Sequence, residues 1–428
     1  MARTPQPAWA SKLAAMSDSA GETSLRSVFP VTLLVALAAL AAVGPLATDT
    51  YLPAFAQMAT DLKASASGIQ LTMTTFLVGI AAGQLLIGML SDRFGRRPLL
   101  VWGTLLALAA GIGTVVAPGL VTLLAARFLQ GLGGAAGMVL GRAVISDRAR
   151  GATATQALSV VMAIQGVAPV VAPILGGVLM DFIGWRGIMA VVAGFTLVML
   201  LMVLAWVPES LPSQDRSSGG LKELARGTRE LMRDGIFVRL VSVNALVFAL
   251  LMCFLSAAPF ILKNVLGMAT GPYTLVFGAC GLTVTVSVGI AGSLVRRVPP
   301  ARQVRVGLTA QLVVDLVFAG VCLAWLGSPT RSTPLLIVVI ALALAHVACL
   351  GLCFGNLPAL ALERTGHRAG TGSALLGFIQ FAAGGLASPL VGLSGEESGA
   401  AFGVVIVVMA VAANAVALLG LQDRGSSS

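Results

Sequence analysis

The sequence has little charge and few of the residues that build catalytic or metal-binding centres. Charged residues make up 10% of its 428 positions, and it contains two histidines. Soluble domains average about 25% charged residues. None of its lysines stands in the Gly-x-x-x-x-Gly-Lys-Ser/Thr loop of nucleotide-driven pumps. These shortages argue against a soluble enzyme, a metal centre and a primary pump, and we expect neither a cofactor nor a metal.

Apolar runs, by contrast, recur along the whole chain. Hydrophobic residues account for 57% of the sequence, and the mean hydropathy is +0.96. About 20 consecutive apolar residues suffice for a helix to cross a bilayer. The pattern therefore predicts an all-α polytopic membrane protein with about twelve spans. We expect them at residues 29–55, 69–90, 98–117, 120–141, 155–180, 187–207, 237–262, 273–295, 303–326, 334–356, 370–391 and 400–420.

The distribution of basic residues predicts how the chain crosses the membrane. The net charge is +10. If both termini face the cytoplasm, the expected outer loops hold only four basic residues, namely Lys63, Arg186, Lys263 and Arg331. Cytoplasmic loops of membrane proteins carry the excess of Lys and Arg. We therefore expect a multi-pass protein of a bacterial inner (plasma) membrane with both termini in the cytoplasm. The basic charge then requires no nucleic-acid partner.

The chain divides into two similar halves around a central polar segment. Residues 88–93 and 292–297 follow corresponding spans, and Gln165 with Pro173 matches Gln380 with Pro389. Two six-helix repeats with a binding site between them form a transporter architecture. We expect a monomer that binds a small-molecule substrate. Its expected parts are an N-terminal tail at 1–27, a helical bundle at 28–207, a cytoplasmic linker at 208–235, a second bundle at 236–420 and a C-terminal tail at 421–428.

The segment 88–98, GMLSDRFGRRP, is the most specific feature of the sequence. Gly88 permits a close helix contact, and Gly95 permits an unusual backbone turn. Asp92 lies among arginines at the expected membrane edge, where it can pair with them or with a neighbouring helix end. We expect Asp92 to hold helices together on the cytoplasmic side. The arginines also anchor the topology, and they are Arg93, Arg96 and Arg97.

Three other segments place polar residues, glycine or proline within apolar runs. Segment 49–53 carries Asp49 and Tyr51. Segment 127–142 carries Arg127, Gln130, Gly131, Gly137 and Arg142. Segment 166–177 carries Gly166, Pro169, Pro173, Gly176 and Gly177. Small residues allow close helix packing, and prolines bend helices by removing backbone donors. We expect the last segment to shape the interface between the halves.

Together these segments resemble motifs of the major facilitator superfamily. Segment 88–98 resembles the signature between its second and third helices. Segment 127–142 resembles the fourth-helix motif of its proton-coupled drug exporters, and 166–177 resembles a fifth-helix motif of antiporters. Segment 49–53 resembles the first helix of the bicyclomycin- and chloramphenicol-resistance type. The resemblance implies two six-helix bundles related by pseudo-two-fold symmetry, and export of small amphiphilic drugs or xenobiotics in exchange for protons.

Asp49 and Arg127 are the candidate proton-coupling residues. The residue pattern alone leaves Asp49 open between a solvated outer loop and a buried site, and the resemblance places this acid in the cavity. A cation inside a membrane helix is costly unless it is paired or hydrated. The first and fourth helices are neighbours in the fold that the resemblance implies. Asp49 is therefore the expected partner of Arg127, which would bias its protonation.

Several polar residues within apolar runs remain open. The candidate substrate-binding residues are Tyr51, Gln130, Gln165, Asn244, Asn356 and Gln380. Gln130 could equally join helices by a hydrogen bond. Asp315 could be protonated or paired with Gln311 one turn away, with a role in transport less favoured. For His346 a hydrogen-bonded neutral imidazole is favoured over a proton relay. The alternative functions are a metabolite transporter of the same fold and, less favoured, a membrane enzyme.

Overall fold

The structure, a computed structural model, describes residues 28–149, 151–216, 221–295, 297–324, 333–365, 369–393 and 399–420. Every regular element in these ranges is a helix, which confirms the predicted all-helical class. Ten of the described helices are long and apolar enough to cross a membrane, and a bent pair raises the number to eleven. The predicted tails at 1–27 and 421–428 lie outside the described residues, as does part of the predicted linker.

The first half of the chain contains the bent pair and three long straight spans. The first span consists of α3 (Val31–Ala41), α4 (Val43–Asp49) and α5 (Phe55–Asp61), with a 3-10 turn at Leu52–Ala54. It is followed by α6 (Ala66–Phe94), α7 (Arg96–Val115) and α8 (Leu120–Arg148). The first span runs past the predicted boundary at residue 55, because the chain continues as α5 beyond the turn.

The fifth and sixth predicted spans form one element, α9 (Gly151–Trp206), which breaks only at Gly184. This residue has φ 62°, a conformation that glycine adopts without steric cost. The two arms double back, so that the chain before and after α9 meets: Asp147 accepts a 2.8 Å hydrogen bond from Ser210. When the arms are counted separately, the eleven spans become the predicted twelve.

The second half begins with a short helix of the linker, α10 (Leu221–Leu231). Asp234 then caps α11 (Gly235–Pro259), because its carboxylate accepts a 2.9 Å bond from the amide of Ile236. The remaining helices are α12 (Thr270–Leu294), α13 (Pro300–Ala324), α14 (Thr333–Phe354), α15 (Asn356–Glu363), α16 (Ala369–Ala387) and α17 (Ala400–Gly420). A π-helical turn, Phe260–Val265, extends α11.

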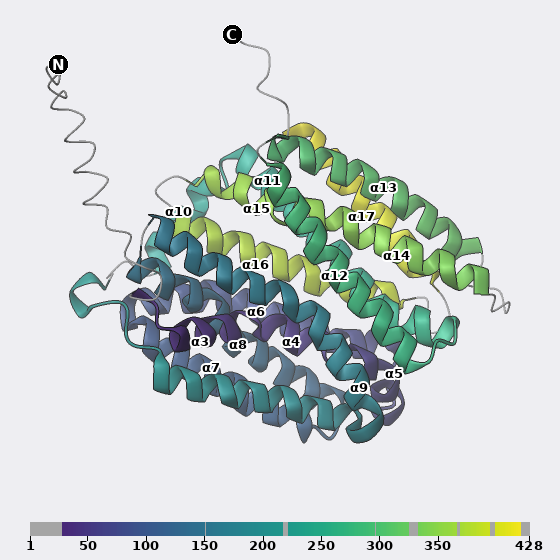
Figure 1. Ribbon diagram of the computed structural model, residues 1–428, viewed down its shortest axis with the longest axis horizontal. Coiled ribbons are helices and arrows are strands. Elements are labelled where there is room, and N and C mark those ends of the chain that lie inside the picture. The colour runs from purple at the N-terminus through teal and green to yellow at the C-terminus, as the bar shows by residue number, and fades with distance from the viewer. Residues whose placement is uncertain are drawn as a thin grey trace, which may run out of the picture.

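The two halves form two helical bundles that lie side by side (Figure 1), the first in purple to teal and the second in green to yellow. Close backbone approaches within the first bundle depend on glycine. A Cβ on Gly131 of α8 would collide with the carbonyl oxygen of Phe76 on α6. Between the bundles, α6 packs against α16 and α9 packs against α12. We call the end that holds α10 and Gly95 the linker end.

Candidate functional site

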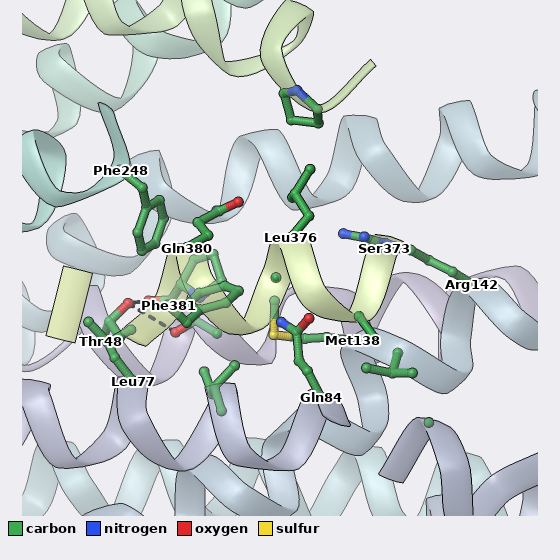
Figure 2. Close-up of a pocket in the computed structure, with 18 of the residues that line it drawn as sticks. Thr48, Leu77, Gln84, Met138, Arg142, Phe248, Ser373, Leu376, Gln380 and Phe381 are labelled. Carbon is green, nitrogen blue, oxygen red and sulfur yellow. Dashed lines mark hydrogen bonds between the residues drawn. The ribbon is translucent and has the colours of Figure 1, made fainter. Parts of the chain in front are cut away.

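A cavity of about 1530 Å³ lies between the two bundles. The first bundle contributes residues of α4, α6, α8 and α9 to its wall, and the second contributes residues of α11, α12, α14 and α16. Figure 2 shows Gln84 and Met138 of the first bundle facing Leu376 and Gln380 of the second. The cavity reaches the linker end, where its wall includes Asp92 and, from α10, Arg226.

The wall of the cavity is mainly apolar and aromatic, with a few polar groups. Its phenylalanines come from α11, α12 and α16 and are Phe248, Phe254, Phe277 and Phe381. Phe248 and Phe381 meet edge to face, with ring centroids 5.0 Å apart. Gln380 accepts a 2.9 Å hydrogen bond from Asn244, which stands behind it. An apolar pocket with a few oriented polar groups suits an amphiphilic small molecule.

Asp49 belongs to the cavity wall at the end of α4. Its side chain is buried, and its carboxylate accepts a 2.8 Å hydrogen bond from the Thr48 hydroxyl. No lysine or arginine forms an ion pair with it within the described ranges. An acid without a cationic partner in an apolar setting is costly in its charged form. The structure thus places Asp49 in the cavity wall, where the resemblance implied it would be.

The end of the bundles opposite the linker is closed. Tyr51 and Phe55 pack with ring centroids 5.2 Å apart, and Phe55 lies 6.0 Å from Phe260 of the other bundle. Polar contacts between the bundles reinforce this closure. Gln70 of α6 donates a 3.2 Å bond to the carbonyl oxygen of Ser256 in α11. The cavity is therefore accessible from the linker end, and its other end is sealed.

Arg127 does not pair with Asp49 in this structure, so the expected ion pair between them is wrong for this conformation. Its fully buried guanidinium donates instead to Gln130 Oε1 at 2.7 Å and to the Ala47 carbonyl at 2.9 Å. Tyr51 and Phe76 place their ring centroids 4.5 and 4.3 Å from it. Carbonyl and aromatic contacts therefore replace the carboxylate as the means of holding this buried cation.

The glycines of the fourth and fifth helical spans lie at close helix contacts. A Cβ on Gly137 would lie 2.9 Å from the carbonyl of Leu40 in α3, and one on Gly176 would collide with the carbonyl of Thr50. A Cβ on Gly177 would meet Thr274 across the bundle interface. Pro173 lines the cavity. Gln165, Gly166 and Pro169 belong to α9, but their side-chain environments lie outside the described part of the chain.

The segment at Gly95 is held entirely within the first bundle. Arg96 binds Asp92 and Ser91 in its own segment, and it reaches Asp147 of α8 with Nε at 3.1 Å. Glu209, beyond α9, accepts from the backbone amide of Arg96 at 2.9 Å. The ion pair between Asp92, at the end of α6, and Arg96, at the start of α7, joins two helices of the first bundle, as expected, and the Asp92 side chain is half exposed.

Further contacts place the other arginines of this end. Arg97 Nη2 donates to the Leu204 carbonyl at 2.9 Å. Arg93 lines the mouth of the cavity, and Gly88 lies on its wall. Arg142 extends into the cavity (Figure 2), and its exposed side chain has no recorded partner among the described residues. Asp147 and Glu209 could not be foreseen, because nothing in their local sequence distinguishes them from ordinary polar residues at helix ends.

Four of the candidate substrate-binding residues do not line the cavity, and one of them is Asn244, which bonds to Gln380 from behind. Tyr51 is fully buried and bonds to Thr72 at 3.0 Å, and Gln130 holds Arg127. Asn356 donates to Gln303 at 3.2 Å and is buried within the second bundle. Gln380 does line the cavity. Gln84, an amide on the opposite wall of the cavity, was not predicted, because its local sequence shows no distinctive pattern.

His346 is hydrogen-bonded, as expected, and its partner is Asp315. Its Nδ1 lies 2.6 Å from Asp315 Oδ1, and both side chains have no exposed surface. Gln311 donates a 2.8 Å hydrogen bond to the same carboxylate oxygen, which agrees with the expected pairing of Asp315 with Gln311. The pairing between α13 and α14 could not be deduced from residues that lie 31 positions apart.

Comparisons with known proteins agree on one family. The model of the Major Facilitator Superfamily matches residues 33–389. The uncharacterized MFS-type transporter YdgK of Bacillus subtilis (strain 168) is 32% identical over 391 residues, 91% of this chain and 94% of YdgK. A bicyclomycin resistance protein homolog of Haemophilus influenzae is 26% identical, covering 92% and 98%. The multidrug resistance protein MdtL of Vibrio parahaemolyticus is 27% identical, covering 78% and 82%.

Solved structures share the architecture at low sequence identity. A bacterial homolog of the human lysosomal transporter Spinster, in an inward-facing and unoccupied conformation, has a TM-score of 0.71 at 17% identity. The match covers 94% of this chain and 98% of the homolog. A D-xylose–proton symporter has a TM-score of 0.65 at 18% identity, covering 90% and 96%. These likenesses confirm the fold that the motifs implied.

Proposed function

For this chain, which belongs to the major facilitator superfamily, we propose export of small amphiphilic drugs or xenobiotics in exchange for protons. The family makes it a multi-pass secondary transporter rather than an enzyme. Relatives named for bicyclomycin and multidrug resistance, at 26% and 27% identity, support drugs as the substrate class. The sealed end faces the outside of the cell in this proposal, and the linker end faces the cytoplasm, as the basic loops favour.

The observation that carries the proposal is Asp49 in the wall of a mainly apolar cavity. Burial opposes the charged form of a carboxyl group, so an acid without a cationic partner there favours holding a proton. Its proton and an amphiphilic substrate would occupy one cavity, so binding of one favours release of the other. The inward proton gradient then drives export. The membrane potential contributes about 2.3 kcal/mol per elementary charge per 100 mV.

Alternating access assigns Asp92 a role in the opposite conformation. Asp92 and Gly370, near the start of α16, both line the mouth of the cavity at the linker end. When this end closes, the carboxylate of Asp92 would approach the positive end of the α16 dipole. In the conformation described here that end is open, and Asp92 pairs with Arg96 instead.

The decisive experiment measures drug accumulation in a susceptible bacterium that expresses the chain, with and without a protonophore. Chloramphenicol and bicyclomycin are the first probes. We expect lower accumulation with the wild type, and loss of this effect with the protonophore or with Asp49→Asn. Glu363→Gln is the matched control, because Glu363 is an exposed acid at the end of α15 and outside the cavity wall. It should export like the wild type.

Two outcomes would contradict the proposal. Unchanged accumulation across a broad drug panel would remove the exporter assignment and favour the alternative, a transporter of metabolites with the same fold. Uptake of sugars, acids and peptides would then be measured. Proton-driven export that survives Asp49→Asn would leave the substrate class intact but remove Asp49 as the coupling acid.

A further inference from the structure

The second bundle contains a buried polar cluster that the proposed export mechanism does not use. Asp315 on α13 and His346 on α14 lie 2.6 Å apart and are fully buried. Gln311 Nε2 lies 2.8 Å from the shared carboxylate oxygen and 2.7 Å from His346 Nδ1. Asp315 Oδ2 and His346 Nε2 have no hydrogen-bond partner among the described residues. Buried polar atoms without partners cost free energy and call for an explanation.

The 2.6 Å distance fixes one proton of this cluster. A carboxylate oxygen and a bare imidazole nitrogen are both acceptors, so they approach this closely only with a proton between them. That proton joins Asp315 Oδ1 to His346 Nδ1 whichever atom holds it. With no further proton the pair has a net charge of −1. With a second proton, on Nε2, the pair is neutral overall.

The surroundings of the pair favour the neutral form. Phe254 of α11 and Phe318 of α13 place their rings 5.5 and 6.5 Å from the imidazole ring. The nearby titratable group is Cys349, one turn along α14, which interacts electrostatically with Asp315. The neighbouring α17 carries no titratable residue, and α11 presents the ring of Phe254 to the imidazole. The buried titratable side chains of α11 and α12 in the same hydrophobic core are Cys253, Tyr273 and Cys280.

No described lysine or arginine forms an ion pair with Asp315. A net charge in such an apolar setting is expensive. The unpartnered Nε2 of His346 is thus the atom at which a second proton is gained or lost.

The cavity lies one side-chain layer away from this atom. The Phe254 ring lies 5.5 Å from the imidazole and also belongs to the cavity wall. Val347, the residue after His346 on α14, lines the cavity as well. A proton from the water of the cavity would pass the Phe254 ring to reach the imidazole. We propose that Asp315 and His346 form a second proton-binding site, which is loaded at His346 Nε2 from the cavity past Phe254.

The first test observes the proton directly and needs no substrate. The chain has only two histidines, His346 and His367, so ¹⁵N-histidine labelling of the full-length His367→Gln protein in nanodiscs gives one imidazole. We expect Nδ1 to stay hydrogen-bonded while Nε2 gains one proton as the buffer is brought from alkaline to acidic pH. Phe254→Ala should speed this exchange. A single protonation state of the imidazole at every pH, in both proteins, would mean that the pair has only a structural role and would overturn the proposal.

The second test counts protons per substrate, and only this test rests on the proposed function. Proteoliposomes with the membrane potential collapsed are loaded with chloramphenicol, a neutral probe, and the steady-state gradient is measured against the pH difference. One coupled proton allows about a tenfold gradient per pH unit, and two allow about a hundredfold. We expect the higher slope for the wild type. The uncharged, hydrogen-bonding pair Asp315→Asn with His346→Gln should lower it to the tenfold value.

The two tests separate failure of this site from failure of drug export. If chloramphenicol is not carried at all, export of that probe fails while the titration of His346 still decides the site. A slope that is unchanged in the double variant, with export intact, would show that the pair does not couple to transport and would overturn its role as a carrier of protons.

Discussion

Lys263 donates a 3.1 Å hydrogen bond from Nζ to the carbonyl oxygen of Pro53, and this bond joins the two bundles at the sealed end of the cavity. The two residues are 210 positions apart. Lys263 stands on the π-helical turn that extends α11, and its ammonium group also lies 5.8 Å from the Tyr273 ring centroid. An irregular turn of this kind commonly marks a functional position in a helix.

Lys263→Met should therefore favour the conformation that opens this end. A hydrogen bond from a charged group contributes about 1.5 kcal/mol or more, so its loss raises a minor open population roughly tenfold. Ser256→Cys, a buried position at the interface, reports this opening through labelling by a membrane-impermeant maleimide. Arg186→Met is the control, because Arg186 donates to the Ala117 carbonyl within the first bundle. Equal labelling of both variants would contradict this role of Lys263.

Gly177 and Gly176 should respond differently to a compensating substitution. A Cβ on Gly177 would collide with the side chain of Thr274, whereas one on Gly176 would collide with the backbone carbonyl of Thr50. Overpacking of this kind costs about 1–3 kcal/mol. We expect Gly177→Ala to slow transport and Thr274→Ala to restore it. Gly176→Ala should lower the free energy of unfolding in denaturant, and no side-chain substitution should restore it. Equal rescue of both would refute the assigned contacts.

The contrast between these glycines also shows what could be predicted from the sequence. Apolar periodicity and basic loops predicted the helical class and the spans, because both depend on the bilayer and not on contacts with distant residues. Gly176 and Gly177 were correctly expected at close contacts, since small residues permit backbone approach, whereas a Cβ on Gly88 would lie at an ordinary 3.9 Å from Val139. Which backbone they approach depends on the packing of whole helices, and the sequence does not contain it.

Partners of buried charges were the least predictable feature. Arg127 was expected to need a carboxylate, but two carbonyls, one amide and two rings satisfy it. His346 was expected to be hydrogen-bonded, but its partner, Asp315 of the preceding helix, could not be named. In both cases several polar groups competed for one partner, and the choice depends on distances of a few ångströms between helices.

The ion pair of Asp234 with Arg364 should make stability depend on pH at the linker end. Burial alone would raise the pKa of Asp234, but hydrogen bonds from Arg364 and from the amides of Phe237 and Ile236 outweigh it and lower this pKa below 3.8. A carboxyl whose folded pKa is depressed stabilises the fold above its unfolded pKa, and this contribution is lost as pH falls through the folded value.

Arg364→Met should therefore lower the unfolding temperature at pH 7, and the difference from wild type should shrink as pH falls below about 3.8. Thermal unfolding of the purified protein in detergent at a series of pH values measures this. Arg302→Met serves as the control for removal of a cation, since Arg302 is exposed and forms no ion pair among the described residues. A difference that persists unchanged at the lowest pH would exclude the ion pair as its cause.

Arg127→Lys should destabilise the protein although the positive charge is retained, because the site is built for a guanidinium group. The planar guanidinium lies between the rings of Tyr51 and Phe76 and donates in several directions, and a lysine ammonium cannot reproduce this arrangement. We expect a loss of about 3 kcal/mol in denaturant unfolding, from the cation–π and hydrogen-bond contributions together.

A double-mutant cycle separates this site from the rejected ion pair. If Arg127 were held by Asp49, Asp49→Asn would compensate for Arg127→Met, because removing both partners leaves no unpaired buried charge. The structure predicts little coupling between these two changes, and coupling of about 1–3 kcal/mol between Arg127→Met and Gln130→Met, whose side chains share a 2.7 Å bond. Strong coupling to Asp49 in equilibrium unfolding would mean that the ion pair forms in the conformation that dominates in solution.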